Sequence, residues 1–110
     1  MTASYESFLT DVHQSCRLIE EATRDGLPSY LGDRRARAVV EWRIYRIGEL
    51  SNQLRDHLHE QIPAVPWRDI IRLRHRLAHH FVYIQAHRLF AIAVNEIPKM
   101  EFALRRRIDT

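Results

Sequence analysis

The sequence predicts an all-α protein, an antiparallel bundle of four to five helices. Apolar residues recur at three- and four-residue steps along most of the chain, which is the period of a helix buried on one face. Only three glycines and four prolines are present, few for a fold of short strands joined by tight turns. Because 110 residues suit one domain, we expect residues 1–110 to form a single helical domain.

Five stretches carry such an apolar stripe: residues 4–24, 34 to about 58, 66 to 79 or 80, 85–95 and 100–108. Ser4 and Asp33 are suited to cap the first two helices. Pro66 suits a first helical turn, where its missing N–H is not needed, whereas Pro98 should break or kink the helix that it follows. Residues 59–65 and 81–84 are expected as connections, the second of them β-prone but too short to pair alone.

The composition narrows the class of protein. A single cysteine, Cys16, excludes an internal disulfide framework and a cysteine-based zinc site. The N-terminus lacks the pattern of a signal peptide, and no apolar run approaches the roughly 20 residues of a membrane helix. We therefore expect a cytoplasmic protein without membrane contact.

The basic residues are almost all arginine and are unevenly distributed. Of 17 basic residues only Lys99 is a lysine. Residues 66–110 hold nine basic and four acidic residues, a net +5, whereas residues 1–65 hold eight and ten, a net −2. If a polyanion binds, the second half is the place to expect it, although a solvated surface explains the charge equally well.

The richest supply of reactive side chains lies near the end of the third expected helix. His75, His79 and His80 cluster there among arginines that include Arg74 and Arg76. Histidine takes and gives protons near neutral pH, and arginine stabilises a charged phosphorane, so such a set suits cleavage of an RNA backbone.

The spacing of Arg74 and His79 carries little information alone. With 16 arginines and seven histidines in 110 residues, about one such pair is expected by chance. The two positions lie about 140° apart on an ideal helix. They converge on one ligand only if the helix ends or bends before His79, or if a second subunit completes the site.

Three ordered segments together are more specific. They are AVVEWRIYRIGEL at 38–50, VPWRDIIRLRHRLAHHF at 65–81 and NEIP at 95–98. Together they resemble the HEPN-domain toxins of the HepT-like family over about residues 33–104. The resemblance implies a metal-independent endoribonuclease without cofactors, from a toxin–antitoxin pair, that cleaves RNA. It also implies a homodimer whose two Arg–His pairs face one cleft, and a nucleotidyltransferase antitoxin that adds AMP to a motif tyrosine.

The family motif is Arg, a polar residue, three further positions, His, any residue and Tyr. Arg74, His75 and His79 match its first three defined positions, which makes Arg74 and His79 the candidate catalytic residues and His75 an assistant. Arg76 and His80 are candidates for assistance or RNA contact. The tyrosine position holds Phe81, which has no hydroxyl, so Tyr83 is the candidate for modification.

Several alternatives stay open at this point. Arg74 could only neutralise a carboxylate such as Glu49, and His80 could only cap a helix end. A zinc site at His75 and His79 lacks the glutamate of H-E-x-x-H and a third ligand, so no metal site is expected. Trp42 and Trp67 are expected to pack against other side chains rather than stack on bases.

A second function of another class also fits. The chain could be a non-catalytic helical module that binds RNA or nucleotides, or that serves as a scaffold partner of a nucleotidyltransferase. Loss of the motif tyrosine at Phe81 is compatible with such a lost activity.

Overall fold

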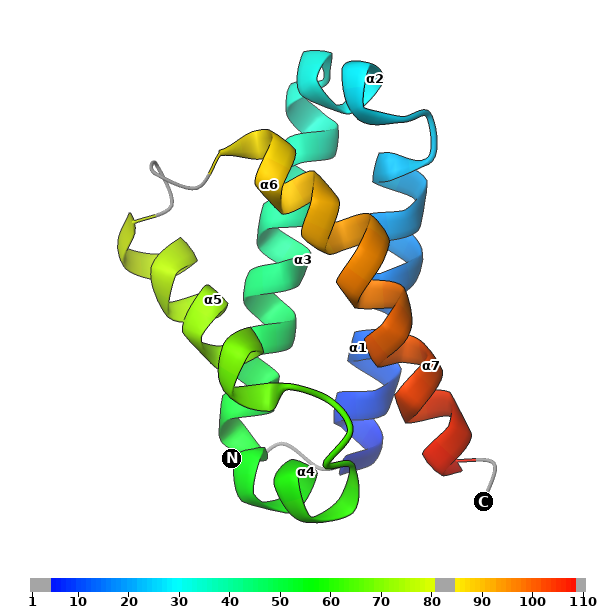
Figure 1. Ribbon diagram of the computed structural model, residues 1–110, viewed down its shortest axis with the longest axis vertical. Helices are drawn as coiled ribbons and strands as arrows, with labels where there is room; N and C mark the ends of the chain where they lie inside the picture. The colour runs from blue at the N-terminus through cyan, green and yellow to red at the C-terminus, as the bar shows by residue number, and fades with distance from the viewer. Residues whose placement is uncertain (1–4, 81–84, 109–110) are drawn as a thin grey trace.

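The computed structural model describes residues 5–80 and 85–108, and all regular secondary structure within these ranges is helical (Figure 1). The elements in chain order are α1 Tyr5–Thr23, α2 Leu27–Gly32, α3 Arg34–Gln53, α4 Arg55–Gln61, α5 Trp67–His80, α6 Ala86–Ala91, the π-helical turn η2 Ile92–Glu96 and α7 Ile97–Ile108. The predicted all-α class is confirmed.

Helix α3 is the centre of the bundle, because α1 and α5 both pack along it. The η2 and α7 segments pack on α1, and α4 lies across the base of the bundle (Figure 1). The apolar stripes predicted for the first two long helices face this core. Its largest fully buried side chains are Trp67, Tyr30, Phe8, Ile19, Ile44, Ile47 and Leu58.

The start of α3 has the predicted cap. Asp33 has an extended backbone, and its carboxylate accepts hydrogen bonds from the backbone N–H groups of Arg35 at 3.0 Å and Ala36 at 3.1 Å. These two donors would otherwise lack a partner in the first helical turn, which is the physical basis of the Asp preference at this position.

The stretch between the first two predicted helices is itself partly helical, and the second predicted helix is divided in two. The segment after Gly26, whose φ of 90° suits glycine, forms the short helix α2, with Pro28 in its first turn. The second predicted helix is interrupted at Leu54, which closes α3 and precedes α4. This break turns α4 across the base, where Leu58 is fully buried (Figure 1).

The break predicted at Pro98 is also absent. The chain stays helical from α6 through α7, and Pro98 lies in the first turn of α7. A proline ring inside an α-helix clashes with the carbonyl four residues earlier. Here the preceding turn is η2, in which the N–H of Ile97 donates to the carbonyl of Ile92, five residues back. This wider turn accommodates the proline without a break.

Two ionisable side chains lie in the interior, and burial raises the pKa of each. The Cys16 thiol is buried, and burial with the nearby Glu101 carboxylate raises its pKa to about 12. Burial likewise raises the pKa of the Tyr30 hydroxyl to about 12. Trp67 is buried, and its indole N–H donates to the carbonyl of Ile62 at 2.9 Å.

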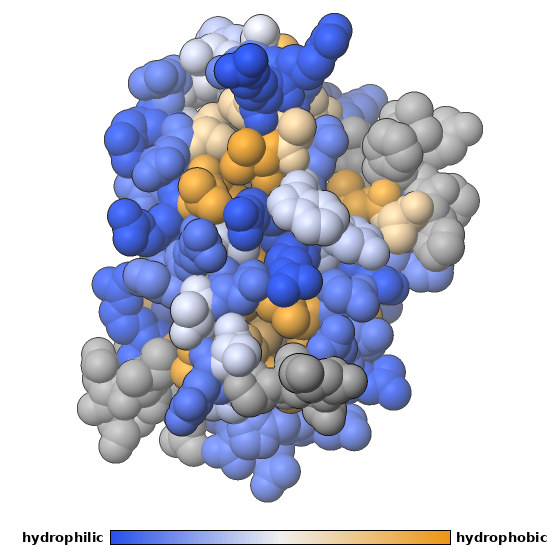
Figure 2. Space-filling model, turned by 180° about the vertical axis from the view of Figure 1, so that it is seen from behind, coloured by the Kyte–Doolittle hydropathy of each residue, from blue (hydrophilic) through white to orange (hydrophobic). Residues whose placement is uncertain are grey.

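Within residues 5–80 and 85–108, no helix combines the length and the apolar character needed to cross a bilayer. The face opposite to the view of Figure 1 is mainly hydrophilic, with separate apolar patches between the charged side chains (Figure 2).

Candidate functional site

Arg74 lies where α5 packs against α3. A terminal nitrogen of its guanidinium forms an ion pair with Glu49 Oε2 at 2.5 Å, and the guanidinium carbon lies 5.5 Å from the centre of the Tyr45 ring. The two charged side chains are only partly exposed, at 23% for Arg74 and 31% for Glu49. Arg74 therefore sits between a carboxylate and an aromatic face, both supplied by α3.

A glycine permits this close packing. A Cβ built on Gly48 would lie 2.9 Å from Arg74 Cγ and 3.1 Å from the carbonyl oxygen of Ile70, and it would overlap Arg74 Cβ. Any larger residue at this position would therefore push α5 away from α3 and move Arg74.

The contact between Arg74 and Glu49 is a close ion pair through a terminal guanidinium nitrogen. Arg74 Nε is buried, takes no part in this pair and has no hydrogen-bond partner among the described residues. Hence Glu49 holds the arginine by charge and leaves its Nε donor uncommitted. Arg74 and Glu49 are thus in contact, as one alternative from the sequence required. A catalytic role for Arg74 stays a prediction.

The other predicted site residues on α5 are placed as follows. His75 and Arg76 are exposed. Arg76 and Arg72 line a groove that also contains Glu96, on the flank of α5 away from Glu49 and Tyr45. Arg76 is therefore not brought together with Arg74.

His79 and His80 belong to α5, which ends at His80 as predicted, but their side chains lie outside the described part of the chain. Because α5 is continuous to His80, the backbone positions of Arg74 and His79 are about 140° and about 7.5 Å apart along the helix. The condition that the helix ends before His79 is not met. Phe81 and Tyr83 lie outside the described residues.

An exposed tryptophan, Trp42, lies beside Tyr45, whose ring faces Arg74. Trp42 is 55% exposed, and its ring stacks on Tyr45 with the centroids 5.7 Å apart. Trp42 and Tyr45 line a shallow depression with residues of α3 and α5, namely Ala38, Glu41, Leu77 and Ala78. We call this surface the Trp42 face.

Sequence reasoning named Glu49 but missed Tyr45 and the exposure of Trp42. Tyr45 and Glu49 are four residues apart and so share one face of a helix, which is the signal that was present. Within the parts of the chain that the structure describes, no three His, Cys, Asp or Glu side chains are placed to share a metal ion.

Fold and site together define an all-α bundle in which one helix, α5, carries both the anchored Arg74 and three histidines, His75, His79 and His80. The family model described as "Ribonuclease HepT-like" matches residues 12–106, and the chain belongs to this family. The predicted family and the predicted enzyme class, a ribonuclease, are thereby confirmed.

Three proteins illustrate the similarity. "Probable ribonuclease HepT" of Thermococcus cleftensis is 28% identical over 102 residues, which cover 92% of this chain and 93% of the relative. A Methanocaldococcus jannaschii protein named "Putative RNase" is 29% identical over 84% of this chain and 77% of its own. A second protein of that name and organism is 28% identical over 87% of this chain and 89% of its own. No solved structure matches the chain significantly.

Proposed function

We propose that this chain is a metal-independent endoribonuclease, the toxin of a toxin–antitoxin pair, which cleaves RNA through Arg74 and His79. The observation that carries the proposal is the placement of Arg74. It is anchored by Glu49 and Tyr45, keeps 23% of its side chain exposed, and shares α5 with His79. Family membership supports the reaction class.

The chemistry requires a base, an acid and a stabilising cation. In the proposed reaction His79 exchanges a proton with the 2′-hydroxyl or with the leaving oxygen, and Arg74 stabilises the charge that develops on the phosphorus oxygens. His75 assists as the adjacent exposed imidazole, and Arg76 and His80 contact RNA. No step in this scheme needs a metal or another cofactor.

The active form in this proposal is a homodimer. On a continuous α5 the backbone positions of Arg74 and His79 lie about 140° apart around the helix axis, so we expect that one chain alone does not bring both groups to one phosphate. The Trp42 face lies beside Arg74 and is exposed and partly aromatic, as the centres of protein interfaces commonly are. A second copy packed on it would bring its own His79 toward Arg74.

The proposed partner is a cognate nucleotidyltransferase antitoxin, in the cytoplasm that also holds the RNA substrate. In this scheme Tyr83 accepts AMP, because Phe81 at the motif position lacks a hydroxyl. Mass spectrometry of the protein after incubation with its antitoxin and ATP tests this. An added AMP mass that persists in Tyr83→Phe would exclude Tyr83 as the acceptor.

The test of the activity is RNA cleavage in the presence of a chelator. We expect the wild-type chain to cut RNA, and Arg74→Ala and His79→Ala each to lose about 10²-fold or more in rate. His87→Ala, at an exposed histidine of α6, is the matched control and should retain activity. Intact RNA with the wild type, or full activity in His79→Ala, would contradict the proposal.

A second candidate function is favoured by one contact. Because Glu49 already neutralises Arg74, the arginine could serve packing alone, in a non-catalytic RNA-binding or scaffold partner of a nucleotidyltransferase. Such a protein would co-purify with the nucleotidyltransferase but would not arrest growth when expressed alone. Growth arrest that depends on His79 separates the two functions.

A further inference from the structure

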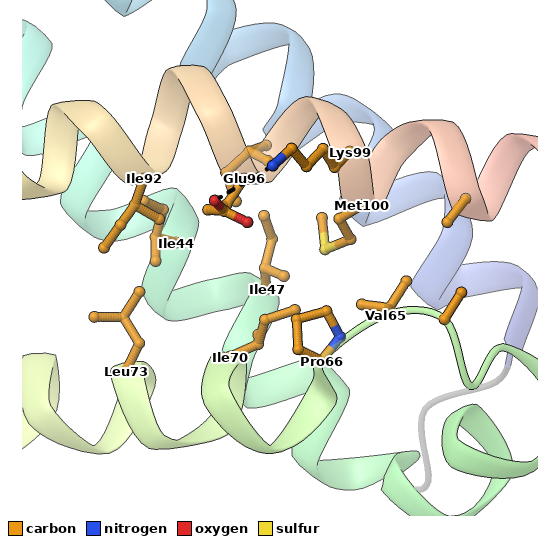
Figure 3. A pocket seen from close by; sticks show the side chains of 13 residues that line it. Ile44, Ile47, Val65, Pro66, Ile70, Leu73, Ile92, Glu96, Lys99 and Met100 are labelled. Carbon is orange, nitrogen blue, oxygen red and sulfur yellow. Dashed lines mark ion pairs between the residues drawn. The ribbon is translucent and has the colours of Figure 1, made fainter.

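An apolar groove runs along the flank of α5 opposite to the Trp42 face. Its floor is formed by Ile44 and Ile47 of α3, and α5 and the η2–α7 segment form its walls (Figure 3). These two walls run antiparallel to each other (Figure 1). The groove holds about 290 Å³ of free space. Its wall side chains are aliphatic: Ile70 and Leu73 on α5, and Ile92, Ile97 and Met100 on the opposite side.

The groove is open because its two walls rest on different supports. Helix α5 packs on α3, whereas η2 and α7 pack on α1. As a result Ile70, Leu73 and Ile92 are only half-buried. An apolar hollow of this kind, rimmed by charged residues, is typical of an interaction site.

The π-helical turn contributes directly to this surface. Ile92 and Glu96, the first and last residues of η2, both line the groove. Single π-helical turns inside α-helices lie frequently at functional sites. The irregular backbone of this segment is thus located at the groove.

The rims give the groove a charge preference. Glu96 and Lys99 on one rim pair with each other at 3.7 Å (Figure 3). On the other rim Arg72 and Arg76 are exposed and are one helical turn apart, with Asp69 as the acidic neighbour on that rim. The unbalanced charge of the α5 rim is therefore positive, and an occupant with carboxylates one turn apart complements it.

We propose that this groove binds an acidic amphipathic helix of a partner protein. From Pro66 to Arg76 the α5 wall is about 15 Å long, the length of about ten helical residues. The apolar face of such a helix covers the half-buried Ile70, Leu73 and Ile92, and its carboxylates face Arg72 and Arg76. This recognition uses the helix-in-groove mode, with anchors at three- and four-residue steps.

The lining favours a protein helix over RNA. Bases of single-stranded RNA stack on aromatic rings or on guanidinium planes. Inside the groove the apolar side chains are aliphatic and none is aromatic, and the guanidinium planes of Arg72 and Arg76 lie at the rim, outside the apolar hollow that a base would have to fill. The groove and the Trp42 face lie on opposite flanks of α5, so a partner helix and a second copy of the chain can bind together. The proposal does not depend on the ribonuclease activity, but Arg76 is also a proposed RNA contact, so Arg72→Glu alone is tested beside the double variant.

The test follows the isoleucine methyl signals of the full chain by NMR during peptide titration. Three synthetic 12-residue peptides serve as probes. One has Leu at helical spacing with flanking Glu, one has Lys in place of Glu, and one is a scrambled version of the first. The reporters are the isoleucines that line the groove, and Ile19, buried in the core on α1, is the internal control.

We expect the acidic amphipathic peptide to shift the groove signals and to leave Ile19 unchanged. The double variant Arg72→Glu/Arg76→Glu should weaken this binding about tenfold, because it reverses the charge of the rim. Arg17→Glu, at an exposed position of α1, should leave the affinity unchanged.

Three results would overturn the proposal. They are no shift at about 1 mM acidic peptide, equal binding of the basic or scrambled peptide, and shifts caused by a single-stranded RNA instead. RNA cleavage by the same variants is measured separately, so a failure of this proposal is distinguished from a failure of the proposed activity.

Discussion

Arg74 combines two contacts that constrain it without enclosing it. Glu49 supplies the opposite charge at 2.5 Å, and Tyr45 supplies a ring face at 5.5 Å. A guanidinium that is oriented by its own fold needs less reorganisation when a phosphate arrives. The question at the residue scale is therefore whether Arg74 serves packing alone or also takes part in catalysis.

The variant Arg74→Lys separates these two roles. Lysine keeps the positive charge beside Glu49 but loses the planar fork that binds two phosphate oxygens. If Arg74 is catalytic, the cleavage rate falls about tenfold or more while the melting temperature stays close to that of the wild type. Unchanged cleavage with a lowered melting temperature would assign Arg74 to packing.

Cys16 makes the stability depend on alkaline pH. Its pKa is about 12 in the folded chain and 9.0 as the ordinary value, because burial disfavours the thiolate. Between these two values the unfolded chain loses the proton and the folded chain keeps it, so stability is fully present below pH 9 and falls as the pH rises toward 12.

We expect the urea midpoint to drop more steeply from about pH 8 to about pH 10.5 in the wild type than in Cys16→Ala. Tyr30 adds a similar loss at higher pH in both proteins, since its pKa is also raised to about 12. Parallel pH profiles would show that the thiol is not the responsible group.

At the scale of elements, the crossing of α3 and α5 is the critical feature. Gly48 lets the two helices approach until Arg74 lies against its backbone, and the same contact fixes Arg74 near Tyr45 and Glu49. The same contact therefore packs the two helices together and places Arg74 in the site.

Gly48→Ala should therefore destabilise the fold by about 1–3 kcal/mol and also reduce cleavage, because the new Cβ meets the Ile70 carbonyl and Arg74. Chemical denaturation and RNA cleavage measure the two effects. Gly32→Ala is the matched control, since nothing lies within 4 Å of its Cβ position. Equal effects of the two substitutions would contradict the importance of the crossing.

The long helices could be predicted because their apolar stripes extend over several turns. The stripes of α1, α3 and α5 place residues such as Val12, Ile44 and Leu77 in the core. Helix α2 has only six residues, too few for a periodic signal. The break at Leu54 was missed because the apolar spacing continues across it to the buried Leu58.

The site could be predicted only in part. Arg74 and its possible carboxylate partner Glu49 could be named from motif and charge. Tyr45 and the exposed Trp42 depend on how α3 and α5 cross, which is a tertiary property that no local pattern contains.

At the scale of the whole molecule, α5 presents two different surfaces on its two flanks. One carries Arg74 and borders the Trp42 face, and the other lines the apolar groove with Arg72 and Arg76. The proposed dimer uses the first flank and the proposed partner helix uses the second. Surfaces for a second copy and for another protein are thus separate.

Trp42→Glu should weaken the proposed dimer by about 2 kcal/mol, because it removes a large aromatic contact and buries a charge. Analytical ultracentrifugation over a concentration series measures the shift toward monomer. Phe102→Glu, at a residue of α7 that is 62% exposed, is the control and should leave the association unchanged. A dimer that is unaffected by Trp42→Glu would place the interface elsewhere.

The central claim is that Arg74 of one chain works with His79 of another. Its most direct test is to mix Arg74→Ala and His79→Ala chains, each inactive alone, and to measure RNA cleavage after subunit exchange. A mixed dimer restores one of the two Arg–His pairs between chains, so random mixing should recover up to about a quarter of the wild-type activity. If mixed dimers form and cleavage stays at the level of the single variants, the composite site is contradicted.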